Sequence, residues 1–124
     1  MIKFLRLENG NLVNVNDIKA IVKSVRLYET NSDGVKRVLR ASIELQTSSG
    51  ILPIFNVRAD APMKEGESWT YASGGGERTV RNIEEILDTM VTLLVDKMND
   101  EDEKIIGIDT RFLEEAMQEE VERG

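Results

Sequence analysis

Alternation of apolar and polar residues over the first sixty positions predicts antiparallel β structure. In the clearest run, residues 35–46, one face carries Val35, Leu39, Ala41, Ile43 and Leu45, and the other carries Lys36, Arg40, Ser42, Glu44 and Gln46. A period of two is typical of a strand that is buried on one side only. The pattern therefore indicates a half-buried strand in an antiparallel sheet.

Turn signals divide this region into further strands. Asn9-Gly10 lies between residues 2–7 and 12–15, and Asn-Gly supplies the positive φ angles of a tight hairpin. A longer strand is expected at residues 18–28, and turns at 30–34 and 47–50 bound the 35–46 strand. Residues 51–57 form the next strand, and Pro53 predicts a sheet edge or an interruption because proline cannot donate to the ladder.

The alternation is lost from Arg58 to Arg78, where we expect a long loop with one further short strand at residues 68–72. Thr79 is then a plausible N-cap of a helix. The apolar side of this helix is Val80, Ile83, Leu87, Met90, Val91, Leu94 and Met98. Ile86, Leu93 and Val95 widen that stripe, which suggests a second partner surface.

A final helix is expected from a cap at Asp109 or Thr110 to Glu122. Its apolar side is Phe112, Leu113, Ala116, Met117 and Val121. The predicted fold is α+β: one domain over residues 1–124, with an N-terminal antiparallel sheet of five to six strands and two C-terminal helices. The sheet and loop region spans 1–78 and the helical region 79–124.

Composition excludes several kinds of chemistry. The 124 residues contain no His and no Cys, which excludes His-based acid/base pairs, Cys nucleophiles, disulfides and ordinary zinc sites. The acidic run Asp100 to Glu103 does not match a calcium loop, because Ile105 stands where that loop needs glycine. We expect no catalytic residues, no metal and no cofactor.

Charge is unevenly distributed along the chain. The formal net charge is −7, which argues against duplex nucleic acid as a partner. Residues 1–81 carry 12 basic and 9 acidic residues, a net +3, and the remainder carries 4 basic and 14 acidic residues, a net −10. This asymmetry suggests one face for an anionic partner, although acidic helix surfaces also serve solubility alone. No apolar run approaches the roughly 20 residues of a membrane span, so we expect a soluble, intracellular protein.

Two segments are candidates for anion or nucleotide binding. Residues 73–76, Ser-Gly-Gly-Gly, precede a helix start flanked by Arg78 and Arg81, which favours phosphate, but the Lys of a Walker A loop is missing. A flexible linker explains the same glycines. Residues 107–112 place Asp109, Thr110, Arg111 and Phe112 at one helix entrance, although simple capping explains Asp109 and Thr110.

Aromatic and arginine side chains complete the candidate site. Trp69, Tyr71 and Phe112 fall at or near loops, where they are available to stack on a base, although Trp69 can equally anchor the core. The arginines that could converge with them are Arg26, Arg58, Arg78, Arg81 and Arg111. Guanidinium groups bind phosphate oxygens in paired hydrogen bonds, so the set suits a nucleotide.

The plan of the chain resembles the phage Thoeris anti-defence sponge family. The resemblance lies in a sheet opening Phe4-Leu5-Arg6-Leu7-Glu8-Asn9-Gly10, a Trp-bearing loop, and a second helix that begins Asp109-Thr110-Arg111. It implies a non-enzymatic homo-oligomer, from dimer to hexamer, in the cytoplasm of an infected bacterium. Such a protein sequesters a cyclic nucleotide signal (gcADPR, and in some relatives also cyclic trinucleotides) without cleaving it, so that a TIR-based effector stays inactive.

The resemblance also implies roles for individual residues. Trp69 or Phe112 would stack on adenine, Arg26 and Arg111 would hold phosphates, and Asp109 or Thr110 would contact ribose hydroxyls. Two other classes remain open. One is a small structural or interaction domain, pleckstrin-homology-like or a phage assembly module, and the other is a metal-dependent nucleotide hydrolase that works through carboxylates.

Overall fold

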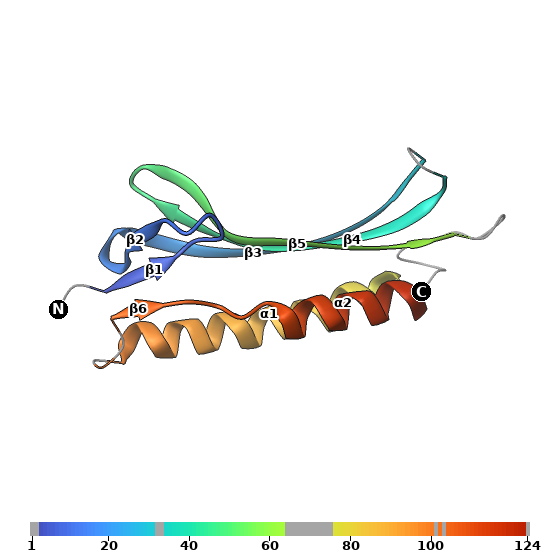
Figure 1. The fold of residues 1–124 in the computed structure, drawn as a ribbon. Coiled ribbons are helices and arrows are strands. Elements are labelled where there is room, and N and C mark those ends of the chain that lie inside the picture. The colour runs from blue at the N-terminus through green and yellow to red at the C-terminus, as the bar shows by residue number, and fades with distance from the viewer. Residues whose placement is uncertain (1–2, 32–33, 64–75, 101, 103, 124) are drawn as a thin grey trace.

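The computed structural model describes residues 3–31, 34–63, 76–100, 102 and 104–123. Its elements are β1 (Phe4–Arg6), β2 (Leu12–Asn14), the 3-10 helix η1 (Val15–Asp17), β3 (Ile18–Thr30), β4 (Lys36–Thr47), β5 (Gly50–Pro62), α1 (Gly76–Asn99), β6 (Ile105–Ile106) and α2 (Arg111–Arg123). The predicted α+β class is confirmed (Figure 1), and the described residues hold five strands ahead of α1. The further short strand expected at residues 68–72 lies outside the described residues.

The strands form two sheets rather than one. The long strands make an antiparallel sheet in the order β3-β4-β5, and the short strands make a second sheet in the order β2-β1-β6. β1 and β2 form the predicted hairpin, with Gly10 at φ 87°. β6, from the connection between the helices, pairs parallel with β1. A two-residue strand is too short to leave a periodic signal in the sequence.

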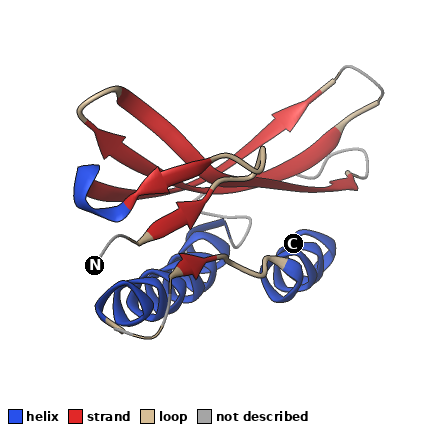
Figure 2. Cartoon of the chain, turned by 60° about the vertical axis from the view of Figure 1, so that its left-hand side comes forward, coloured by secondary structure: helices blue, strands red, loops and turns tan. Residues whose placement is uncertain are grey.

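Both helices lie on one face of the β3-β4-β5 sheet (Figures 1 and 2). α1 packs beneath β3 and α2 beneath β5. The sheet contributes Leu39, Ala41, Ile43 and Leu45 of β4 to this interface, and all four are buried as predicted. The helices contribute Ile83, Leu87, Met90 and Leu94 from α1 and Leu113, Met117 and Val121 from α2.

Two predictions on the buried faces are wrong. Val35, expected to be buried with Leu39, precedes β4 and is 48% exposed. Arg37 takes the corresponding place on the helix-facing side, where its guanidinium Nη2 donates to the carbonyl of Glu122 at the end of α2 (3.3 Å). Phe112, expected on the apolar side of α2, is 65% exposed. Phe112 immediately precedes Leu113 in α2. Successive residues of a helix point in different directions, so Phe112 lies outside the buried stripe.

The element bounds differ most from the prediction at the end of β5 and at the start of α1. β5 continues to Pro62, because Ala59 and Ala61 face the helices and are buried beneath α2. Small residues at this interface allow a close approach of α2, but they leave a weak apolar pattern. The predicted edge position and interruption at Pro53 are both present, since β5 is an outer strand and its register shifts between Phe55 and Pro53.

The start of α1 differs as well. α1 begins at Gly76, so Thr79 is not its N-cap. Thr79 is buried inside the first turns, and its hydroxyl donates to Oε2 of Glu120 on α2 (3.4 Å). The predicted cap of α2 is confirmed, because Oδ1 of Asp109 accepts from the backbone N–H of Arg111 (3.0 Å).

Lys3 joins the N-terminal segment to the end of α1. Its side chain is almost fully buried, and Nζ donates to the carbonyls of Met98 (2.8 Å), Lys97 (3.4 Å) and Asp100. The last carbonyls of a helix lack partners within the helix, and a cation there also interacts favourably with the helix dipole. Lys3 therefore fixes α1 against the small sheet.

Leu87 offers a direct test of the helix–sheet interface. It is fully buried, so Leu87→Ala should lower the free energy of unfolding by about 2–5 kcal/mol, measured by urea denaturation followed by circular dichroism. The matched control is Ile51→Ala, because Ile51 is 62% exposed and should change stability by less than about 0.5 kcal/mol. Equal effects of the two substitutions would contradict this packing.

Candidate functional site

Three arginines lie in one row across the open face of the long sheet, the face that the helices do not cover. Strand register pairs Arg26 on β3 with Arg40 on β4, and Arg40 with Arg58 on β5. Alternation along each strand turns the three side chains away from the helices, because Val25, Leu27, Leu39, Ala41, Val57 and Ala59 on either side belong to the core. We call Arg26, Arg40 and Arg58 the arginine row.

The arginine row is only partly neutralised within the chain. Nε of Arg40 donates to the hydroxyl of Tyr28 (2.9 Å), and Nη1 of Arg58 pairs with Oδ2 of Asp60 (2.8 Å). Across the described part of the chain, the side chain of Arg26 has neither an ion pair nor a hydrogen bond. Like charges directly opposite each other on adjacent strands are destabilising. Three arginines placed opposite one another therefore lower the stability of the sheet, and a surface with a purely structural role would not be expected to carry them.

A polar depression of 330 Å³ lies beside the arginine row. It is lined by Ser24, Arg26, Arg40, Ser42, Glu44 and Asn56. The two guanidinium groups donate to anions, and the Ser and Asn side chains both donate and accept hydrogen bonds. The Glu44 carboxylate accepts only. This set suits a ligand that carries both a negatively charged group and hydroxyl groups.

Tyr28 extends this surface by one row toward the end of the sheet. The hydrogen bond from Arg40 lowers the pKa of Tyr28 from its ordinary value of 10.0; burial acts in the opposite direction, and Arg58 adds to the lowering. The phenol is 38% exposed. Tyr28 therefore places an accessible aromatic ring beside two guanidinium groups.

The predicted site at the start of α2 is largely occupied by its own groups. Arg111 donates to Asp109 through Nε (3.1 and 3.2 Å) and Nη2 (2.7 Å). These bonds, with the backbone N–H of Arg111, hold the pKa of Asp109 at about 2. The Arg111 guanidinium is exposed but already paired with a carboxylate, so a phosphate would have to compete with Asp109.

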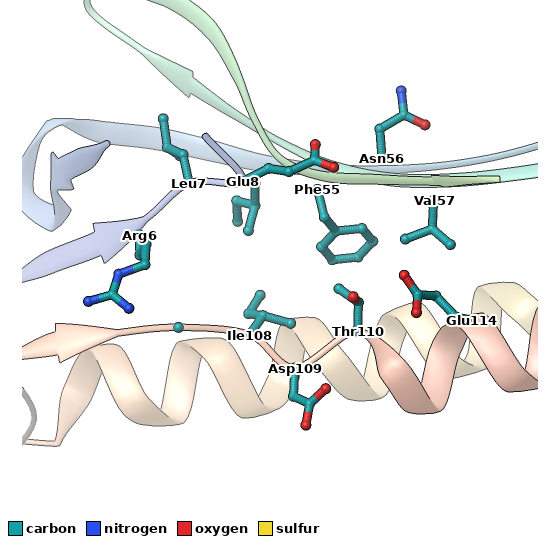
Figure 3. A pocket seen from close by; sticks show the side chains of 12 residues that line it. Arg6, Leu7, Glu8, Phe55, Asn56, Val57, Ile108, Asp109, Thr110 and Glu114 are labelled. Carbon is teal, nitrogen blue, oxygen red and sulfur yellow. The ribbon is translucent and has the colours of Figure 1, made fainter. Parts of the chain in front are cut away.

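A larger cavity, of 490 Å³, lies between β5, the end of β1 and the start of α2 (Figure 3). Phe55 and Val57 point from β5 toward α2, while Asn56 points to the opposite side of the sheet (Figure 3). The charged side chains that line this cavity are Arg6, Glu8, Asp109 and Glu114. Three carboxylates against one arginine disfavour phosphate here.

The predicted site residues therefore do not converge on one point. Arg26 and Arg58 share the open face of the sheet, whereas Arg78 and Arg81 are exposed on α1, which lies on the other side. Arg81 pairs with Glu77 (3.3 Å). Asp109 and Thr110 line the 490 Å³ cavity, and Phe112 faces a groove between α1 and α2. Trp69, Tyr71, Gly74 and Gly75 lie outside the described residues.

Arg40 is the site residue that the sequence prediction missed. The sequence pattern places Arg40 correctly on the polar face of the 35–46 strand, but the predicted set of ligand-binding arginines does not include it. The turn at 30–34 sets Arg26 opposite Arg40. The turn at 47–50 alone would place Val57 opposite Arg40, and the register shift between Pro53 and Phe55 brings Arg58 there instead. Register, rather than any sequence motif, brings these residues together.

No known protein family, curated protein or solved structure matches the chain. In the described part of the chain, no group of three or more acidic side chains is arranged to hold a metal ion. None of the described helices is both long and apolar enough to cross a bilayer.

The contact between Tyr28 and Arg40 can be tested by titration. We expect the Tyr28 phenol to ionise below pH 10.0, because the Arg40 guanidinium stabilises the phenolate. Ultraviolet absorbance between pH 8 and 12 would report it, with Tyr28→Phe identifying its contribution beside that of Tyr71. Arg40→Met should move the Tyr28 transition to higher pH. An unchanged transition in Arg40→Met, or a shift of equal size in the Arg81→Met control, would refute the assigned contact.

Proposed function

We propose that this chain binds a phosphate-bearing nucleotide on the open face of the β3-β4-β5 sheet and holds it without chemical change. The arginine row is the observation that carries the proposal. Charge-assisted bonds from guanidinium to phosphate are short and bidentate, and they are stronger than bonds between neutral groups. A bound phosphate would also relieve the repulsion among Arg26, Arg40 and Arg58.

Arg26 is the arginine of the row whose side chain is most available to a ligand. It has no side-chain partner in the described residues, and it lines the 330 Å³ depression together with Arg40. Binding a phosphate at Arg26 therefore breaks no existing ion pair. Arg58 can make a second contact, but its guanidinium would then bind the phosphate and the Asp60 carboxylate at the same time.

The remaining groups of the depression fit the rest of a nucleotide. Glu44 and Asn56 offer acceptors for ribose hydroxyls, and Ser24 and Ser42 offer further hydrogen bonds. The exposed ring of Tyr28 provides a surface on which a base can stack. Among the described residues that line the depression, Glu44 is the one carboxylate, so no pair exists to divide general acid and base roles. This favours capture over cleavage.

The resemblance to the Thoeris anti-defence sponges narrows the proposal to a cyclic ADP-ribose-type signal. In this role the protein lowers the free concentration of the signal, and the TIR-based effector stays inactive. The arginine row supports such a ligand through its charge and hydrogen-bonding groups. The described helices leave this face open (Figure 1), so a homo-oligomer, from dimer to hexamer, can enclose the ligand with a second copy.

Direct binding to defined nucleotides tests the proposal. The purified chain is titrated by calorimetry with cyclic ADP-ribose isomers and cyclic oligonucleotides, and bound material is analysed by mass spectrometry after heat release. At least one of these should bind and return intact. Arg26→Gln and Arg40→Gln should each weaken binding about tenfold to a hundredfold, the range expected for a lost charge-assisted hydrogen bond.

Arg81→Gln is the matched control, because Arg81 is an exposed arginine on α1 away from the open face. It should leave the dissociation constant unchanged. Recovery of a cleaved nucleotide would instead support a hydrolase. Failure of every nucleotide to bind, or full binding by the Arg26→Gln/Arg40→Gln double variant, would overturn the proposed site.

A further inference from the structure

Two hollows follow one another along the outer side of α1, and together we call them the groove. Its first part measures 390 Å³ and is lined by Asn82, Glu85, Ile86, Thr89, Phe112 and Glu120. A second part of 230 Å³, lined by Met90, Leu93, Leu94, Lys97, Gly107, Ile108 and Asp109, lies farther along α1. Both parts lie away from the arginine row. They therefore form a surface that the proposed function does not use.

A large apolar side chain is exposed in each part of the groove. Phe112 is 65% exposed and Leu93 is 57% exposed. Asn82, Ile86, Leu93 and Lys97 follow one another at helical spacing along one side of α1, a distance of about 22 Å at 1.5 Å per residue. α2 borders the part with Asn82 and Ile86, and residues 107–109 border the part with Leu93 and Lys97. The length of this side of α1 matches about four helical turns of a partner.

Hydrogen bonds define one end of the groove. Oε1 of Glu120 accepts from Nδ2 of Asn82 (3.1 Å), and Oε2 accepts from the hydroxyl of Thr79 (3.4 Å). These bonds tie α2 to the first turns of α1. The first part of the groove therefore lies between two helices held in a fixed arrangement, with Ile86 on α1 and Phe112 on α2.

The charge beside the groove indicates what can occupy it. Three carboxylates and one lysine line the groove: Glu85, Asp109, Glu120 and Lys97. The exposed Asp96, Glu115 and Glu119 lie on the outward side of the two helices by their spacing from Leu93 and Phe112. Residues 82–124 carry a net −10. A second copy docked through the same face would bring two acidic surfaces together, and neither helix of this chain is a basic amphipathic helix.

We propose that this groove binds a basic amphipathic helix of another protein. The apolar side of that helix would pack against Ile86, Leu93 and Phe112, and its lysines or arginines would face the acidic residues outside the groove. Helix-in-groove recognition uses anchors spaced by three, four and seven residues, and the groove is long enough for four turns. Because the groove and the arginine row lie on opposite layers, a nucleotide and a helix can bind at the same time.

Model peptides provide the test. The probe is a fluorescently labelled 18-residue helical peptide of Leu and Lys with Leu on one face, and the matched control peptide has Glu in place of every Lys. Fluorescence anisotropy should detect binding of the basic peptide and not of the acidic one. Phe112→Ala and Leu93→Ala should each weaken binding about tenfold, as truncation of a buried anchor does.

Ile51→Ala is the control variant, since Ile51 is as exposed as Phe112 but lies on β5. It should bind the basic peptide like the unaltered chain. Circular dichroism verifies that every variant is folded. Equal binding by Phe112→Ala, Leu93→Ala and the unaltered chain would overturn the proposal. So would concentration-dependent self-association, measured by sedimentation, that Leu93→Asp abolishes, because a second copy would then occupy the groove.

Discussion

The one-sided packing of the β3-β4-β5 sheet is the constraint on which the rest of the structure depends. Each long strand alternates, so that Leu39, Ala41, Ile43 and Leu45 of β4 meet the helices while Arg40, Ser42 and Glu44 face away. Burial of apolar side chains stabilises the helix side. The other side is free to carry charged groups, and the strand register then collects Arg26, Arg40 and Arg58 into one row. The candidate site is thus a consequence of how the core is built.

The helix layer shows a complementary division of charge. The acidic residues of the chain are concentrated in α1, α2 and their connection, whereas the arginine row lies on the opposite face of the sheet. Lys3 at one end of α1 and Glu120 near the other hold the helices in place through buried or half-buried hydrogen bonds. These contacts allow Phe112 and Leu93 to stay exposed without loosening the core. The molecule therefore offers two chemically different surfaces on opposite sides.

Local sequence signals predicted much of this architecture. Glycines at turns, alternation in β4 and the apolar stripe of α1 each reflect interactions within a few residues, so they could be recognised without the fold. The misses had nonlocal causes. Ala59 and Ala61 extend β5 because α2 packs on them, and Thr79 lies inside α1, where it contacts Glu120. β6 exists through its pairing with β1, and Phe112 is exposed because α2 turns its Leu113 stripe to the sheet.

The sequence by itself determined the class of fold, the half-buried character of the long strands, the absence of histidine and cysteine chemistry and the uneven charge. These properties follow from composition and from periodicity along a single element. Tertiary structure alone decided that three arginines meet on one face of the sheet. Arg26, Arg40 and Arg58 come from three strands and become neighbours only through register, while Arg111 is paired with Asp109 two residues away. Contacts between distant segments depend on the geometry of the whole core, which no local pattern specifies.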